Sequence, residues 1–262
     1  MLARMRTLTL SLAAAAATVL AAPPALAQAD EEPLARFEDA ICPGVVGLRI
    51  EAAEEMVSRI RARATEFGRR MAPEGTCEPN LIVAFVDDGL AFAQRMRRDN
   101  GWLFAELSEA DRDVALHESG PARALLRVRA RSRDGMPIAR REDMVDLPQT
   151  TMWMAHSKIY TATRNDILYS MILVDRAAIT GMSIAQLSDY ATFRSLTRTL
   201  PQTPDTRADS ILSLFDGGAR PAGMTDFDRA YLAELYRGIP NLPAPLRMAG
   251  LEAATGRDIF IE

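Results

Sequence analysis

The segment 181–196 constrains the fold most, because its apolar side chains do not form a single stripe. A helix turns by about 100° per residue, which puts Ile184 and Leu187 on one side. Tyr190 and Phe193 fall on the other side. A surface helix carries one apolar stripe, which faces the core. The segment is therefore predicted to be an interior helix, covered on both sides by the rest of the chain.

Polar residues mark where this helix begins. Ser183 and, three residues later, Gln186 fit a capping box, in which each side chain bonds the backbone N–H of the other residue. Thr180 is an acceptable N-cap slightly earlier. Two interpretations of Gln186 stay open at this point: a partner in the cap, or a polar group that faces a ligand.

The first 27 residues have the composition of a secretory signal. Arg4 and Arg6 precede an apolar run from Leu8 to Leu20, and the small residues of 25–27 suit a signal peptidase. A retained membrane anchor is the alternative, but the apolar run is short for a bilayer. We therefore expect residues 1–27 to be removed on export, with no membrane span after them and a periplasmic or secreted location.

The exported part is mildly acidic and contains two cysteines. The formal net charge of the whole chain is −4, and removal of the two signal arginines makes it −6. A chain of this charge has no general attraction for nucleic acid. In an oxidising compartment Cys42 and Cys77 are expected to form a disulfide, which would stabilise the fold by about 3–4 kcal/mol.

Apolar spacing predicts the elements of the N-terminal half. Helical spacing over 53–67 predicts an amphipathic helix, and the run Leu81–Val86 predicts a buried strand. A second helix is predicted through Phe92, and Ser108 with Asp111 is predicted to begin a third.

The clearest alternation in the sequence falls at 126–133. Leu126, Val128 and Ala130 alternate with arginines, which predicts a strand with one buried face. The arginines of the other face are Arg127, Arg129, Arg131 and Arg133. They form either an anion-binding row or a solvated face that discourages edge-to-edge association. We favour the solvated face, because no aromatic residues interleave the arginines as a stacking platform for nucleic acid requires.

Two apolar runs further along are predicted to form an antiparallel hairpin. They span Thr151–Tyr160 and Ile167–Val174, and the polar residues 163–166 separate them. The polar stretch 134–148 is predicted to be an exposed loop. The second run is apolar on both faces, so we expect it inside the sheet and next to the helix of 181–196.

The C-terminal part is predicted to be mainly helical. Residues 201–209 form a predicted loop and Ser210–Asp216 a short apolar segment. Thr225 and Asp228 are expected to cap a helix, and an alanine-rich helix follows. No composition shift suggests a linker, so residues 28–262 are interpreted as a single α+β domain.

Few residues have the spacing of a catalytic or metal site. His117 and Glu118 begin like the zinc motif H-E-x-x-H, but Pro121 stands where the second histidine is required. The other histidine is His156, whereas a hydrolytic zinc site needs three protein ligands. Two carboxylate pairs are interpreted as turn and cap residues: Asp87 with Asp88, and Asp226 with Asp228. We assign no catalytic residue and expect no metal or cofactor.

The order of elements over about 150–240 resembles a group of exported bacterial proteins related to zincin-type metallopeptidases. The resemblance rests on the apolar hairpin, the helix of 181–196, the segment Ser210–Asp216 and the helix that Thr225 caps. In the peptidases the central helix carries a histidine and glutamate pair that serves the zinc site.

Aligned with H-E-x-x-H, the central helix of this chain lacks each functional side chain. Gln186 and Tyr190 stand at the two histidines and Leu187 at the glutamate. In the extended metzincin pattern, Phe193 stands at the glycine and Leu196 at the third histidine. The resemblance therefore implies a zincin-like α+β scaffold without zinc, in which a mixed or antiparallel sheet packs on the central helix and further helices follow.

We therefore expect a catalytically inactive, metallopeptidase-like binding or structural module of the cell envelope, with a peptide, a protein or an envelope component as its partner. The expected groove is bordered by residues 151–160. Its floor consists of Gln186, Asp189 and Tyr190, whose side chains can hydrogen-bond an extended backbone. The alternative is a metal-independent hydrolase or lyase that uses Asp189 and Tyr190 with an arginine of 127–133.

Overall fold

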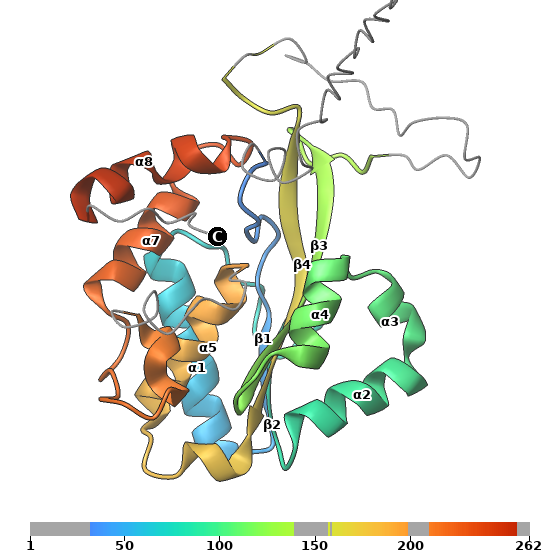
Figure 1. Cartoon of the computed structure of the whole chain (residues 1–262), viewed down its shortest axis with the longest axis vertical. Helices are drawn as coiled ribbons and strands as arrows, with labels where there is room; N and C mark the ends of the chain where they lie inside the picture. The colour runs from blue at the N-terminus through green and yellow to red at the C-terminus, as the bar shows by residue number, and fades with distance from the viewer. Residues whose placement is uncertain (1–31, 139–156, 158, 199–209, 256–262) are drawn as a thin grey trace, which may run out of the picture.

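A four-stranded mixed sheet lies at the centre of the structure (Figure 1). The structure is a computed structural model that describes residues 32–138, 157, 159–198 and 210–255. Its strands are β1 (Pro43–Val46), β2 (Leu81–Val86), β3 (Ala122–Ser132) and β4 (Thr163–Asp175). Their order is β1-β2-β4-β3; the first three of these run parallel, and β3 runs antiparallel to β4.

Helices cover both faces of the sheet (Figure 1). One face is covered by α1 (Ile50–Glu66), α5 (Ile184–Leu196), α7 (Asp226–Tyr236) and α8 (Ala244–Thr255). The opposite face is covered by α2 (Gly89–Asp99), α3 (Gly101–Ala105) and α4 (Glu109–His117). Two 3-10 helices, η2 (Arg176–Ile179) and η3 (Ile211–Phe215), precede and follow α5 along the chain. We call these two layers the α5 side and the α4 side.

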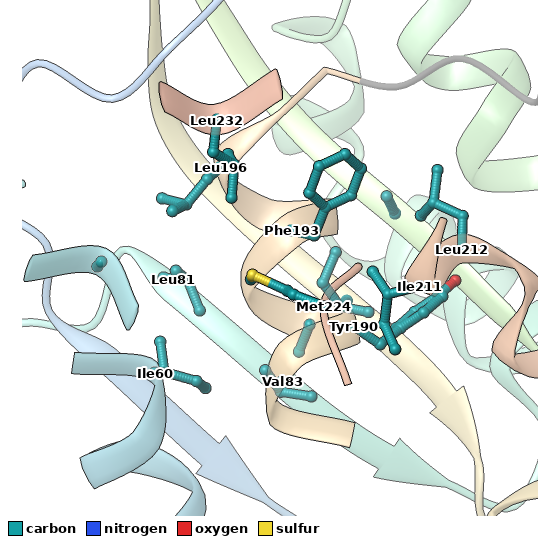
Figure 2. Packing of buried hydrophobic residues seen from close by; sticks show 14 of the residues in the cluster. Ile60, Leu81, Val83, Tyr190, Phe193, Leu196, Ile211, Leu212, Met224 and Leu232 are labelled. Carbon is teal, nitrogen blue, oxygen red and sulfur yellow. The ribbon is translucent and has the colours of Figure 1, made fainter. Parts of the chain in front are cut away.

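Each side of the sheet has its own hydrophobic core. On the α5 side, Ile60 of α1, Val83 of β2 and Phe193 of α5 belong to one large cluster, which Figure 2 shows from close by. The cluster on the α4 side is smaller and includes Phe104 and Leu125. Every residue of α5 from Leu187 to Leu196 is buried, as the two-sided apolar pattern of this helix predicted.

Local sequence signals predicted the N-terminal elements well. β2 has the predicted bounds, and α1 begins three residues before and ends one residue before the predicted helix of 53–67. Cys42 and Cys77 form the expected disulfide, with Cα atoms 6.1 Å apart, and it joins the beginning of β1 to the turn before β2. The predicted class, α+β with a mixed sheet, is confirmed.

The predicted hairpin is wrong in its pairing. The antiparallel partner of β4 is β3, and this ladder joins Ala122 to Val174 at one end and Ser132 to Thr163 at the other. Residues 163–166, predicted to be a turn, form the beginning of β4. The reason is tertiary: opposite charges such as Arg131 and Asp166 meet across the two strands, which favours this register over a local turn.

Several predicted segments lie outside the described residues. They include the signal of 1–27, most of the first hairpin run (151–156 and 158), residues 139–148 of the predicted loop, and the loop of 201–209. Within the described ranges, no helix combines the length and the apolar character needed to cross a membrane.

Candidate functional site

Helix α5 begins at the predicted capping box. Ser183 Oγ accepts a hydrogen bond from the backbone N–H of Gln186 at 3.2 Å, and Gln186 Oε1 accepts one from the N–H of Ser183 at 3.0 Å. The Nε2 of Gln186 donates to the carbonyl oxygen of Pro221 at 2.7 Å. Gln186 therefore caps its own helix and also holds the segment that follows η3 against it.

Asp189 connects three separate parts of the chain. This residue is 4 % exposed, and its carboxylate accepts hydrogen bonds from Arg63 Nε of α1 at 2.7 Å and from the N–H of Met224 at 2.9 Å. The hydrogen bond with Asp189 is the main reason why the pKa of Arg63 is raised. Gly223 permits the close approach, because a Cβ there would lie 2.6 Å from Asp189 Oδ2. Asp189 thus clamps α1 and the segment before α7 onto α5.

Tyr190 is buried against η3, just before the segment that Asp189 bonds. Its ring meets that of Phe215 edge-on, with centroids 4.9 Å apart, and Figure 2 shows it beside Ile211. Gln186, Asp189 and Tyr190 therefore all contact residues 211–224 of the same chain. The sequence placed these three side chains at the floor of an open groove, whereas in the structure they face this segment, which we call the cover segment.

The other positions of the aligned metal motif also serve packing. Leu187 is 3 % exposed, and Phe193 and Leu196 are buried in the core of the α5 side. Phe193 meets the ring of Tyr231 of α7 with centroids 5.8 Å apart. At each of these positions the side chain fills space between α5 and a neighbouring element.

A cavity of 320 Å³ opens beside the cover segment. Ala178 of η2 and Thr180 after it line one side, and Phe215 and Arg220 of the cover segment line the other. Met182, just before the N-cap of α5, adds to its apolar wall. Sequence reasoning missed this cavity, since its walls come from segments that are far apart in the chain and carry no motif.

His117 and Glu118, which begin the incomplete zinc motif, form polar contacts within the chain. His117 is exposed at the end of α4, where its Nδ1 lies 2.7 Å from Asp113 Oδ1. Glu118 forms an ion pair with Arg194 of α5, and both side chains are almost fully buried. His156 lies outside the described residues. In the part of the chain that the structure describes, no group of three His, Cys, Asp or Glu side chains is arranged to hold a metal ion.

The arginines of β3 pair with acidic residues of this chain. Arg127 Nε lies 2.5 Å from Glu106 Oε2, and Arg131 Nη1 lies 3.3 Å from both Asp39 Oδ2 and Asp166 Oδ2. The predicted strand is therefore present, but part of its arginine row is neutralised by carboxylates. This pairing weakens the interpretation of the row as an anion-binding surface.

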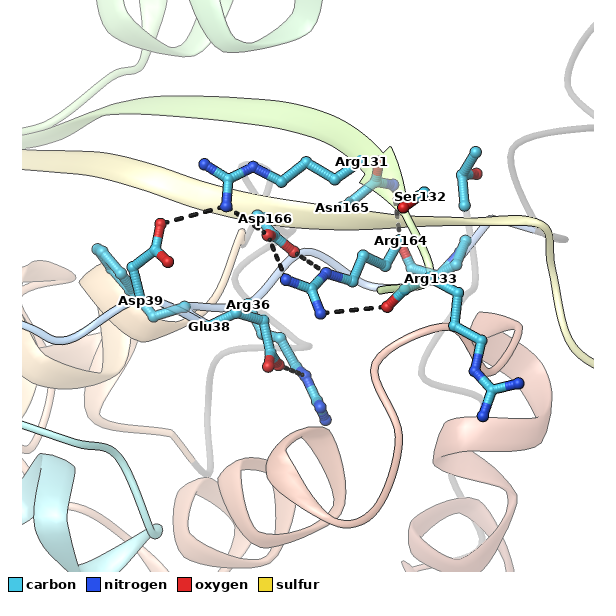
Figure 3. A network of polar contacts seen from close by, with 12 residues as sticks. Arg36, Glu38, Asp39, Arg131, Ser132, Arg133, Arg164, Asn165 and Asp166 are labelled. Atoms are coloured by element: carbon cyan, nitrogen blue, oxygen red, sulfur yellow. Dashed lines mark hydrogen bonds and ion pairs between the residues drawn. The ribbon is translucent and has the colours of Figure 1, made fainter. Parts of the chain in front are cut away.

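Asp166 lies at the centre of a polar network at the beginning of β4 (Figure 3). It is 1 % exposed and pairs with Arg164 at 2.9 Å as well as with Arg131. Burial raises the pKa of Asp166, and the hydrogen bond from Arg164 opposes this shift. Sequence reasoning missed the network because it interpreted 163–166 as a turn; the alternation of opposite charges there was the available signal.

The two carboxylate pairs serve local structure. Asp88 caps α2 by accepting the N–H of Ala91 at 2.8 Å, and Asp228 completes the capping box of α7 with Thr225. Asp87 pairs with Arg176 at the surface, and Asp226 lies in the first turn of α7. The predicted cap roles of Asp88 and Asp228 are confirmed.

Comparisons with known proteins add nothing to this geometry: no family model, no curated protein and no solved structure matches the chain. The fold and the site alone define its class. It is an α+β protein with helices on both faces of a mixed sheet, and its central helix is covered by its own chain.

Proposed function

We propose that this protein is an exported binding or structural module of the cell envelope, with a core that is a catalytically inactive relative of the zincin-type metallopeptidases. One observation carries the proposal: the carboxylate of Asp189, the acidic side chain of the central helix, already accepts hydrogen bonds from Arg63 and Met224. A carboxylate held in this way between a cation and a backbone N–H is stabilised as a structural acceptor.

The arrangement of the sheet supports the proposed relationship. α1 and α5 lie on the same side of the sheet, and the antiparallel strand β3 stands at its edge within the described chain. The disulfide between Cys42 and Cys77 supports the proposed export, because such bonds persist in oxidising compartments. The partner we propose is a peptide, a protein or an envelope component, and the acidic composition does not favour nucleic acid.

The alternative, a metal-independent hydrolase or lyase, gains no support from the site. Acid and base chemistry by Asp189 requires its carboxylate to reach a proton of the substrate. The charged partner of Asp189 is Arg63, a permanent cation. Arg127 and Arg131 of β3 are paired with acids elsewhere.

Zinc content of the exported chain tests the proposal. The full chain would be expressed with its own leader, recovered from the periplasm without added metal, and measured by elemental analysis beside an Asp189→Asn variant. We expect both proteins to contain zinc far below one atom per chain and to leave a general peptide substrate uncleaved. Stoichiometric zinc in the natural chain, accompanied by peptide cleavage, would overturn the proposal.

A further inference from the structure

The cavity beside the cover segment has the size of a small-molecule site. Its volume is 320 Å³, at the lower end of the about 300–1,000 Å³ that is typical of ligand pockets. It opens where η2 and the turn after it meet η3 and the residues that follow η3. A ligand site here goes beyond the proposed function, because the cavity lies outside the expected groove. Its argument does not depend on the metallopeptidase relationship.

The wall of the cavity combines apolar side chains with a single charge. Ala178, Met182, Leu214 and Phe215 supply apolar surface. Among the described residues that line the cavity, Arg220 is the charged one. Thr180 adds a hydroxyl, and Arg220 is exposed at the mouth. Apolar surface beside a few polar groups is the usual form of a site for a small amphipathic ligand.

The guanidinium of Arg220 has capacity for an anion. Its Nη1 donates to the carbonyl oxygen of Thr180 at 3.4 Å, and this is one of five N–H donors that an arginine carries. Within the described ranges, Arg220 forms no ion pair with a carboxylate of the chain. Gly181, at φ +77°, lies beneath the guanidinium: a Cβ there would be 3.6 Å from Nη1.

We infer that this cavity binds an apolar group that ends in a carboxylate, with the carboxylate on Arg220 and the apolar part against Met182 and Phe215. Arginine binds carboxylates through two parallel N–H···O bonds, a geometry that a single guanidinium provides. A short-chain carboxylic acid and the C-terminal residue of a peptide share this chemistry. Occupation of the cavity would also brace Phe215, whose ring packs on Tyr190 of α5.

Binding of hexanoate, measured by calorimetry and ligand-observed NMR on the exported chain, tests the inference. Hexanol serves as the neutral probe of the same length. The key variant is Arg220→Gln, and the matched control is Arg95→Gln, because Arg95 is an exposed arginine of α2 that packs on Phe92, away from the cavity. We expect hexanoate affinity to fall about tenfold or more in the first variant and to stay unchanged in the second.

A second variant tests the apolar wall separately. Ala178→Trp should fill the cavity and remove hexanoate binding while the circular dichroism spectrum stays unchanged, which shows that the chain still folds. A short peptide that ends in leucine, compared with its C-terminally amidated form, distinguishes the two sources of the carboxylate. Tighter binding of the free-acid peptide than of hexanoate assigns the site to a peptide C-terminus, and the reverse assigns it to a free acid.

Three results would overturn the inference. One is the absence of saturable hexanoate binding by the natural chain. Another is equal affinity for hexanoate and hexanol, and the last is unchanged affinity in Arg220→Gln. None of these results bears on the zinc content of the protein, so a failure here is distinguishable from a failure of the proposed function.

Discussion

The two sides of the sheet hold their helices by different means. On the α5 side, buried polar groups reach across long stretches of sequence: Asp189 bonds Arg63 and Met224, and the phenol of Tyr236 donates to the carbonyl oxygen of Leu196 at 2.8 Å. On the α4 side, pairs such as Arg127 with Glu106 lie near the surface, and the buried pair of Glu118 with Arg194 joins this side to α5. The α5 side therefore fixes its connecting segments with buried polar bonds, whereas the α4 side has the smaller hydrophobic core.

The largest effect should come from the aromatic core of the α5 side. Phe193→Ala is expected to lower the free energy of unfolding by about 3–5 kcal/mol, because Phe193 is 2 % exposed and surrounded by core residues. Phe104→Ala on the α4 side should cost less, since α3 is a five-residue helix in an outer layer that can collapse into the space. Denaturant unfolding followed by circular dichroism measures both; equal losses would remove the difference between the sides.

The disulfide should contribute the next largest effect. The double variant Cys42→Ser with Cys77→Ser is expected to lose about 3–4 kcal/mol of unfolding free energy, because the bond closes a loop of 35 residues in the unfolded chain. The same denaturant experiment, run with and without reductant, checks this value. If reductant leaves the natural chain unaffected while the bond is shown to be open, the stabilising role is wrong.

The clamp on α5 should have an intermediate effect. Asp189→Asn is expected to lose about 1–3 kcal/mol, because it removes a charge that pairs with Arg63 and weakens the bond from Met224. The matched control is Asp113→Asn, an exposed aspartate on the α4 side, which should change stability by about 0.5 kcal/mol or less. A loss in the control as large as that in the clamp variant would show that burial does not set the cost.

The smallest effect is expected from the arginine row. Arg127→Gln should lower stability by about 0–1 kcal/mol, because its ion pair with Glu106 is partly solvated. The loss should also shrink at high salt, which screens exposed charges. A loss that persists at high salt would place Arg127 among the structural side chains that the α5 side uses.

Local signals in the sequence were sufficient for the elements, but the pairing of distant elements was not predictable. The capping box at Ser183, the strand at Leu81–Val86 and the two-sided burial of α5 each follow from residues within one or two helical turns. The register of β3 with β4 depends on groups about 35 residues apart, such as Arg131 and Asp166. From neighbouring residues alone, 163–166 were predicted to be a turn.

The surroundings of the predicted groove residues were not predictable from the sequence. Gln186, Asp189 and Tyr190 are neighbours on the predicted helix, yet nothing in the local sequence says that residues 211–224 lie against them. Asp189 is 126 positions from Arg63, so no spacing rule connects the two. Without a spacing motif, such contacts can be identified only from the tertiary structure.

Hydrogen exchange along α5 shows whether this helix is a packing element that residues 211–224 cover. We predict that the amides of Asp189 to Phe193 exchange as slowly as any in the protein, and that Asp189→Asn accelerates exchange in the cover segment before it does so in α2. Fast exchange of α5 in the natural chain, at the rate of the exposed helix α2, would show that residues 211–224 do not cover this helix.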